Sequence, residues 1–103
     1  MPAAKPALAS EPADFEVASF PNPFNPSTTI PYGLPEPCQV RLTIYSALGQ
    51  TVRVLVDANQ DVGYHSVQWD GRDAVGRQVT SGVYLYRLEA GENLAVRRMV
   101  LVR

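Results

Sequence analysis

Hydrophobic and polar residues alternate in short runs along most of this chain. The clearest run is Gln39–Tyr45, where Val40, Leu42 and Ile44 fall on one face and the remaining residues fall on the other. Alternation with a period of two predicts a half-buried β-strand, whereas apolar residues at 3.6-residue spacing would predict a helix. From residue 15 onward no stretch of about ten positions has that helical spacing. The pattern therefore predicts strands and no helix.

Turn signals divide the chain into about seven short strands. The strands are predicted at residues 15–19, 28–34, 39–45, 51–56, 64–69, 83–90 and 94–102, with turns at 46–50, 58–62 and 91–93 and a long polar loop at 70–78. Short strands at a spacing of about ten residues predict an all-β fold, an immunoglobulin-like antiparallel β-sandwich. The core candidates are Val40, Leu42, Ile44, Val67, Trp69, Leu85 and Leu88.

The strand at 83–90 is apolar on both faces, so its register is open. Val83 and Leu85 compete with Tyr84 and Tyr86 for the inner face. If the two tyrosines point outward, they form a flat aromatic platform of the kind that stacks on sugars; if they point inward, they pack in the core. A carbohydrate-binding module of a modular glycoside hydrolase is therefore an alternative function.

Prolines and glycines divide the chain into two parts. All nine prolines lie within residues 2–37, and all seven glycines lie from Gly33 onward. Residues 1–14 are rich in Ala and Pro, which is typical of a semi-stiff linker, and residues 15–103 are the predicted folded domain. The linker resembles a cut junction, so we expect a fragment whose export signal lies on the missing part of a longer protein. The Pro21–Phe24 corner is expected to support the fold.

Charge and composition narrow the possible partners. The net charge is −1, which gives no overall field that would attract nucleic acid. Apolar runs are far shorter than the roughly 18 residues of a membrane span. Cys38 is the only cysteine, so the chain forms neither an internal disulfide nor a cysteine-based metal site. We expect no cofactor, no nucleic-acid partner and no membrane span.

Catalysis has little support in the sequence. His65 is the only histidine, and it shares a predicted strand face with Val67 and Trp69. It is either a general base or metal ligand, or a half-buried strand residue, and the second reading is favoured because no acid or nucleophile is tied to it. We expect that the chain is not an enzyme.

One turn resembles the start of a calcium loop. Asp57, Asn59 and Asp61 place oxygen ligands at alternate positions. An EF-hand loop requires Gly at its sixth position and Glu at its twelfth, where this sequence has Val62 and Gln68. A polar turn without a metal is the favoured interpretation.

The final strand combines arginines with an apolar run. Its residues are Arg97, Arg98, Met99, Val100, Leu101, Val102 and Arg103. Charged residues on an edge strand either protect it against aggregation or offer a label that a receptor reads. We expect this segment to be an exposed address, and we expect a domain truncated before Met99 to stay folded.

Four stretches together resemble the C-terminal sorting domain of the type IX secretion system of Bacteroidetes. They are residues 20–30 followed by 32–35, residues 40–45 with 48–49 and Val52, residues 63–73, and residues 81–88 with 98–103, in that order along the predicted domain. The third and fourth stretches are also similar to the immunoglobulin-like domain of the flagellar hook-capping protein. The motif residues carried by the resemblance, which we expect to be structural, are Pro21, Asn22, Pro23, Phe24, Gly63, Trp69, Gly82 and Tyr84.

The resemblance implies a non-catalytic module that directs secretion and attaches its carrier to the cell surface. Its implied partners are the outer-membrane type IX translocon, a sortase, an anionic lipopolysaccharide and a covalently linked N-terminal cargo domain. The implied location is secreted or cell-surface. A structural spacer, as in the hook-capping protein, is a further alternative.

Overall fold

The computed structural model describes residues 27–102, which form six β-strands and no helix. The strands are β1 (Thr28–Leu34), β2 (Cys38–Ser46), β3 (Thr51–Gln60), β4 (Gly63–Trp69), β5 (Gly82–Ala90) and β6 (Asn93–Leu101). The predicted strand at 15–19, the linker at 1–14, the Pro21–Phe24 corner and Arg103 lie outside the described residues. Since residues 27–102 contain no helix, they contain none that is long and apolar enough to cross a membrane.

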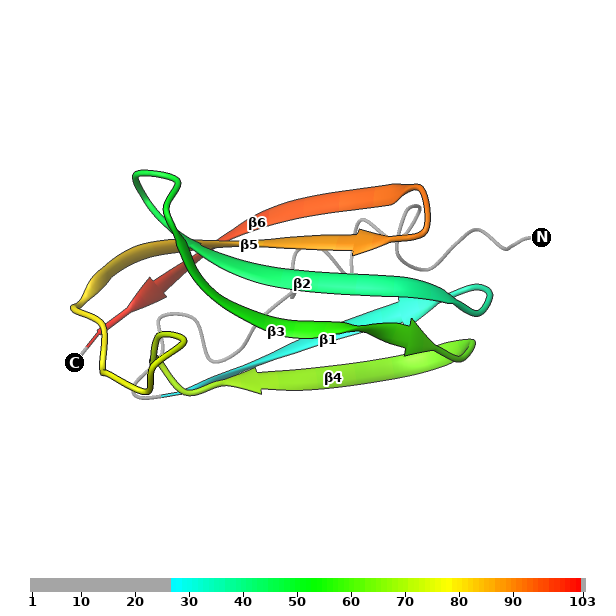
Figure 1. Cartoon of the computed structure of the whole chain (residues 1–103), viewed down its shortest axis with the longest axis horizontal. Coiled ribbons are helices and arrows are strands. Elements are labelled where there is room, and N and C mark those ends of the chain that lie inside the picture. Colours follow the sequence, from blue (N-terminus) through cyan, green and yellow to red (C-terminus); the bar gives the residue numbers. More distant parts are fainter. Residues whose placement is uncertain (1–26, 103) are drawn as a thin grey trace.

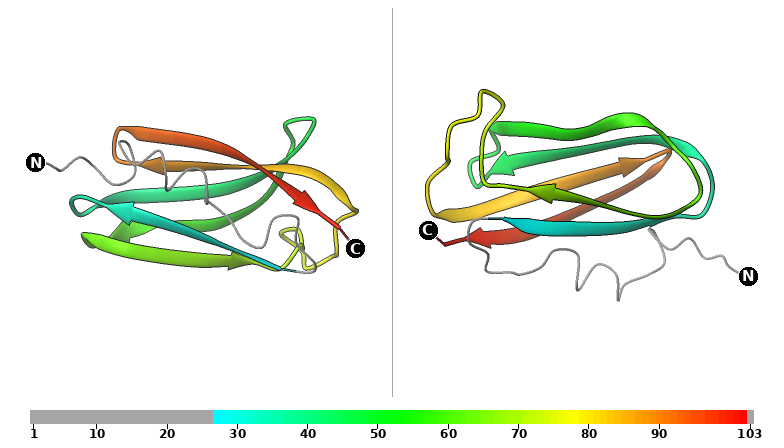
Figure 2. Two further views of the ribbon diagram at one scale, coloured as in Figure 1. Left: turned by 180° about the vertical axis from the view of Figure 1, so that it is seen from behind. Right: turned by 90° about the horizontal axis from the view of Figure 1, so that it is seen from below.

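The six strands make two antiparallel sheets (Figure 1). β1 pairs with β4 in the smaller sheet, and the larger sheet has the order β3-β2-β5-β6. The sequence predicted an all-β immunoglobulin-like sandwich, and this architecture is confirmed. The β2–β3 turn, the long loop between β4 and β5, and the end of β6 gather at one end of the sandwich (Figure 2).

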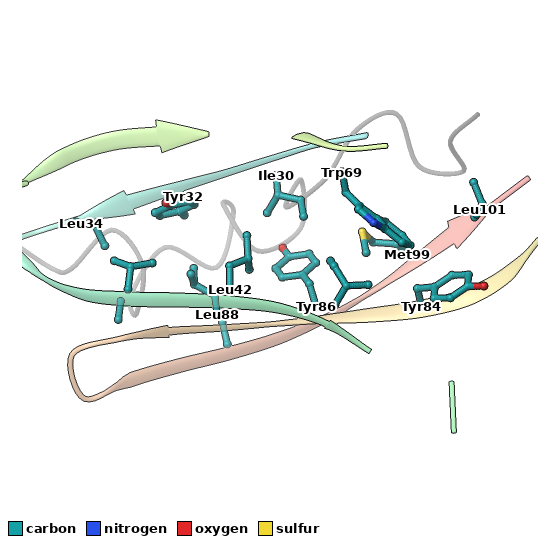
Figure 3. Packing of buried hydrophobic residues seen from close by; sticks show 14 residues of the cluster. Ile30, Tyr32, Leu34, Leu42, Trp69, Tyr84, Tyr86, Leu88, Met99 and Leu101 are labelled. Atoms are coloured by element: carbon teal, nitrogen blue, oxygen red, sulfur yellow. The ribbon is translucent and has the colours of Figure 1, made fainter. Parts of the chain in front are cut away.

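A single core fills the space between the sheets. Figure 3 shows Ile30, Tyr32 and Trp69 of the smaller sheet pointing toward the side chains of the larger sheet. Each large apolar side chain that is fully buried contributes about 1.5–3 kcal/mol relative to exposure. We call the core-lining side of the larger sheet its inner face, which carries Val40, Leu42, Ile44, Tyr84, Tyr86, Leu88, Ala90, Ala95, Met99 and Leu101.

The opposite side of the larger sheet is its outer face. Because side chains alternate along a strand, this face receives the residues between those of the inner face, and one of them, Thr43, is itself buried. They include Thr51, Val54 and Asp57 of β3, Arg41, Thr43 and Tyr45 of β2, Val83, Leu85, Arg87 and Glu89 of β5, and Leu94, Val96, Arg98 and Val100 of β6.

The core predictions hold except at two positions. Val40, Leu42, Ile44, Trp69 and Leu88 are buried as predicted. Val67 is half-buried and packs against the core. Leu85 was predicted inside and lies on the outer face, so that prediction is wrong.

The aromatic rings decide the register of β5. Tyr84 and Tyr86 are buried, which excludes the exposed sugar platform. Tyr84 meets Trp69 edge-on, with ring centroids 5.3 Å apart, and its hydroxyl donates to the Thr80 carbonyl at 2.7 Å. Rings bury more apolar area than Val and Leu do, so this register gains more than the one with Leu85 inside.

β3 is longer than the sequence predicted. It runs to Gln60, so the turn predicted at 58–62 is wrong in its first residues. The last four residues of β3 pair with Cys38–Arg41 although they are mostly polar, because an edge strand with an exposed side tolerates polar residues. Two register shifts leave Val52 and Leu55 unmatched on β2, and both pack against the core.

Candidate functional site

The last strand, β6, is fixed to the domain by its inward side chains. It pairs with β5 along its whole length, from Asn93 opposite Ala90 to Leu101 opposite Gly82. Met99 and Leu101 are fully buried, and Ala95 is nearly so. These residues make β6 part of the core.

This burial conflicts with the expectation that a domain truncated before Met99 stays folded. Removing residues 99–103 would remove two buried side chains and one end of a strand ladder. Large-to-Ala changes at single buried Met or Leu positions cost about 2–5 kcal/mol each. The segment therefore has a structural role in addition to any role in recognition.

The two adjacent arginines of β6 point to opposite sides of the sheet. Arg97 is half-buried and lies opposite Tyr86, and its Nη1 donates to the Val96 carbonyl at 2.7 Å. Arg98 is exposed on the outer face, opposite Leu85. Val100 on the same face is half-buried, and Val102 beyond the strand is exposed. The part of the predicted address that faces solvent is therefore Arg98 with Val102.

The motif residue Trp69 lies at the end of β4, where the chain leaves the smaller sheet. The ring is fully buried, and its Nε1 donates to the Arg72 carbonyl at 2.9 Å. The Tyr84 ring packs against it and bonds to the Thr80 carbonyl. Each ring therefore ties one end of the loop between β4 and β5 to the core.

Two motif glycines begin strands with a positive φ. Gly63 opens β4 with φ +126°, and Gly82 opens β5 with φ +151°. Residues with a Cβ rarely adopt this conformation, so Gly is required by the backbone at both positions. No side chain or backbone atom lies within 4 Å of where a Cβ would stand, so space is not the constraint.

Asp73 organises the loop between β4 and β5. Its Oδ1 accepts hydrogen bonds from the backbone N–H groups of Arg77 at 2.9 Å and Val75 at 3.1 Å. The bond from Arg77 is the largest cause that lowers the pKa of this carboxyl. The Ala74 N–H donates to the carbonyl of bulged Val52 at 3.1 Å, so the loop also covers the start of the β3 edge.

Comparison with known proteins identifies the fold. The family model described as the FlgD Ig-like domain matches residues 25–93, which is more than half of the chain. The chain belongs to this family. No curated protein matches it.

Solved structures with a similar fold include two flagellar proteins and one secretion component. FlgD of Pseudomonas aeruginosa is 22% identical, with a TM-score of 0.58 over 72% of this chain and 60% of that one. FlgD of Xanthomonas campestris, described as a hook-capping protein essential for flagellar assembly, is 23% identical with a TM-score of 0.59, over 81% and 61%. PorZ of Porphyromonas gingivalis, described as an essential surface component of the type IX secretion system, is 20% identical with a TM-score of 0.59, over 91% and 13%.

These likenesses establish the fold of this FlgD Ig-like domain. The identities are below a quarter, and the chain spans about three fifths of the two FlgD chains and a small part of PorZ. The full activities of those proteins therefore belong to longer chains.

The lone histidine of this FlgD Ig-like domain is half-buried on β4. The His65 ring stacks on Tyr32 with centroids 5.5 Å apart, and its Nε2 lies 2.8 Å from the Asp61 carbonyl oxygen. The Tyr32 hydroxyl donates to Gln60 Oε1, and burial raises the Tyr32 pKa. These contacts join the β3–β4 turn to β1 and bring no second acid or nucleophile to His65.

The segment that resembles the start of a calcium loop, interpreted from the sequence as a polar turn, is mostly strand. Asp57 and Asn59 lie within β3, and the Asp57 Oδ1 accepts a hydrogen bond from Gln39 Nε2 at 2.9 Å. Across residues 27–102, no group of three His, Cys, Asp or Glu side chains is placed to hold a metal ion.

Cys38 is half-buried, and burial raises the pKa of its thiol.

The sequence missed the chemistry of the outer face. The sequence placed Arg41 and Tyr45 on the face opposite the core residues but did not predict their neighbours, and pairing of β2 with β5 sets Arg41 beside Glu89 and Tyr45 beside Leu85. The available signal was the strand at 83–90, whose two apolar faces left its register open.

Proposed function

We propose that this domain is a non-catalytic sorting and cell-surface attachment module of a longer exported protein. The observation that carries the proposal is the division of β6 into two sides. Met99 and Leu101 hold the strand in the core, while Arg98 on the strand and Val102 just beyond its end lie at the surface. A strand fixed in this way presents a charged and apolar label in one conformation, at little entropic cost when a receptor binds.

The proposed receptor is the outer-membrane type IX translocon, acting with a sortase. A similar fold in PorZ, a surface component of that system, supports this choice. The resemblance of four sequence stretches to the sorting domain supports it independently. After translocation, attachment to an anionic lipopolysaccharide would hold the cargo at the surface, and the export signal would lie on the longer protein.

A structural spacer is the second candidate. The family match to the FlgD Ig-like domain favours it, because one FlgD relative is described as a hook-capping assembly protein. A spacer needs its core and its two ends, and it is indifferent to single exposed side chains on β6. This difference separates the two candidates.

The test uses a secreted reporter fused ahead of residue 1, in a host with a working type IX system. The variant is Arg98→Ser with Val102→Ser, which changes only exposed positions and leaves Met99 and Leu101 in the core. We expect the purified variant to keep its near-ultraviolet circular dichroism and the fusion to lose surface delivery.

The matched control is Arg77→Ser, an exposed arginine in the loop between β4 and β5. Its fusion should reach the surface as the parent does. If the double variant folds and is delivered normally, sorting through β6 is wrong and the spacer function gains support.

A further inference from the structure

The outer face of the larger sheet carries exposed apolar side chains that the core does not use. Val54 and Val83 are each 38% exposed, Val96 is 45% exposed and Leu94 is 57% exposed. Tyr45 and Leu85 lie between them and are half-buried. In the described part of the chain both sheets are accounted for, and neither packs on this face. An exposed apolar sheet face is typical of an interaction surface.

Strand pairing arranges this face in rows that run across the four strands. One row has Asp57, Arg41, Glu89 and Leu94 on β3, β2, β5 and β6 in that order. The next has Val54, Thr43, Arg87 and Val96. The third has Thr51, Tyr45, Leu85 and Arg98.

The outer face can pair with the outer face of a second copy. A twofold axis parallel to the strands and midway between β2 and β5 places each β2 residue opposite the β5 residue of the same row in a second copy. Arg41 then faces Glu89 of the second copy, and Tyr45 faces Leu85 of the second copy. The same axis exchanges β3 with β6, so Val54 faces Val96. Opposite charges therefore meet in one kind of pair and apolar side chains meet in two. The same axis sets Asp57 opposite Leu94, Thr43 opposite Arg87 and Thr51 opposite Arg98, and these pairs bring together neither opposite charges nor two apolar side chains.

We propose that the outer face binds the outer face of a second copy of this chain about that twofold axis. The charged pair is available in the single chain. Arg41 is exposed and makes no side-chain hydrogen bond or ion pair within the described residues, and the carboxylate of its neighbour Asp57 accepts a hydrogen bond from Gln39. Among the described residues, the Glu89 side chain has one ion-pair partner, Arg87, whose Nη2 lies 3.4 Å from Glu89 Oε2 at the surface. The Glu89 carboxylate of each copy therefore retains acceptor capacity for Arg41 of the other copy.

The sheet geometry fits such a pair. Sheets that pack face to face lie about 10 Å apart and cross at about 30°, which displaces residues near the middle of the twofold axis least. Arg41, Tyr45, Leu85 and Glu89 are on the two central strands, next to that axis. The bonded ladder of four strands gives a footprint of roughly 20 by 25 Å, or about 500 Å² for each copy. That is about 1,000 Å² in total, which is below the range of stable complexes and gives a weak dimer.

The test is sedimentation equilibrium of the full 103-residue chain from about 10 µM to about 1 mM, the range over which a weak dimer forms. The parent chain should self-associate reversibly toward the upper end. Arg41→Glu places two carboxylates opposite each other at each charged contact, and Glu89→Arg places two guanidiniums there. Each variant alone should dimerise at least about tenfold more weakly.

The decisive measurement is the association of the two charge variants when they are mixed. When Arg41→Glu meets Glu89→Arg, each charged contact again joins a carboxylate to a guanidinium, so the mixture should associate about as well as the parent. Effects of either substitution within one chain cannot produce this recovery. The control mixture is Arg77→Glu with Glu92→Arg, which has the same net charges at exposed positions away from the face. It should associate no better than the parent alone.

A third variant tests the same face independently if a charge variant does not fold. Val96→Asp changes a side chain that is 45% exposed and should weaken association about tenfold with folding intact. The proposal is overturned if the parent stays monomeric at the highest concentration, if Val96→Asp associates as the parent does, or if the mixed charge variants associate no more strongly than either variant alone.

Discussion

The two faces of the larger sheet come from the same four strands and differ in what covers them. The inner face is closed by β1 and β4, and its Val40, Leu42 and Ile44 have no exposure to solvent. The outer face carries Val54, Val83 and Val96, which keep between 38% and 45% of their surface. Apolar residues on the first face stabilise the fold, while those on the second contribute little until something binds them. Hydrophobicity of a strand residue therefore does not reveal which role it has.

The largest expected effect comes from removing the largest side chain that the smaller sheet packs against the inner face. Trp69→Ala deletes a fully buried ring, its contact with Tyr84 and the hydrogen bond to Arg72. We expect a loss of about 3–5 kcal/mol in the free energy of unfolding, measured by urea denaturation. Tyr64→Ala on the same strand is the control, since that ring is 85% exposed, and it should change the free energy by about 0.5 kcal/mol or less. Similar losses for both would mean that β4 does not close the core.

A matched pair of substitutions compares the faces directly. Val→Thr keeps the shape of the side chain and adds a hydroxyl, so its cost reports burial. Val40→Thr puts that hydroxyl among core side chains and should cost about 1–3 kcal/mol. Val96→Thr leaves the hydroxyl in water and should stay within about 0.5 kcal/mol. Both are measured at low micromolar concentration, where the chain is monomeric. If Val96→Thr costs as much as Val40→Thr, the outer face is covered and is not an interaction surface.

The sequence predicted the inner face where only one face of a strand is apolar. Gln39–Tyr45 alternates between apolar and polar residues over most of its length, and its three aliphatic residues are buried as expected. Alternation fails at 83–90, where Leu85 was assigned to the core and lies outside. Two apolar faces satisfy the same pattern, and the tyrosine face is selected by the larger area that its rings bury and by contact of Tyr84 with Trp69 across the sandwich. That contact joins residues distant in sequence, so no local pattern contains it.

The candidate site was only partly predictable for the same reason. The segment from Arg97 to Arg103 was assigned to recognition as a unit, but pairing with β5 divides it into alternate residues. Met99 and Leu101 go to the core, and Arg98 goes to the surface. The self-complementary rows of the outer face depend on the register between β2 and β5, which the sequence does not give.

The smallest expected effect concerns the inner face at high pH. Burial raises the pKa of Tyr86, and Arg97, its partner on β6, opposes that rise without overcoming it. An unfolded chain releases the phenol proton near pH 10, while the folded chain keeps it. Above that pH the unfolded state binds fewer protons, so the free energy of unfolding falls as pH rises, by up to about 1.4 kcal/mol per pH unit for this one group.

Tyr86→Phe removes that contribution, and the decline in the free energy of unfolding between about pH 10 and 11 should become shallower by about 1 kcal/mol. Some decline will persist, because the pKa values of Tyr32 and Cys38 are also raised by burial. The measurement is urea denaturation of both proteins at each pH. If their profiles remain parallel through this range, the Tyr86 hydroxyl is open to water, and the inner face is less completely closed than its buried aliphatic residues indicate.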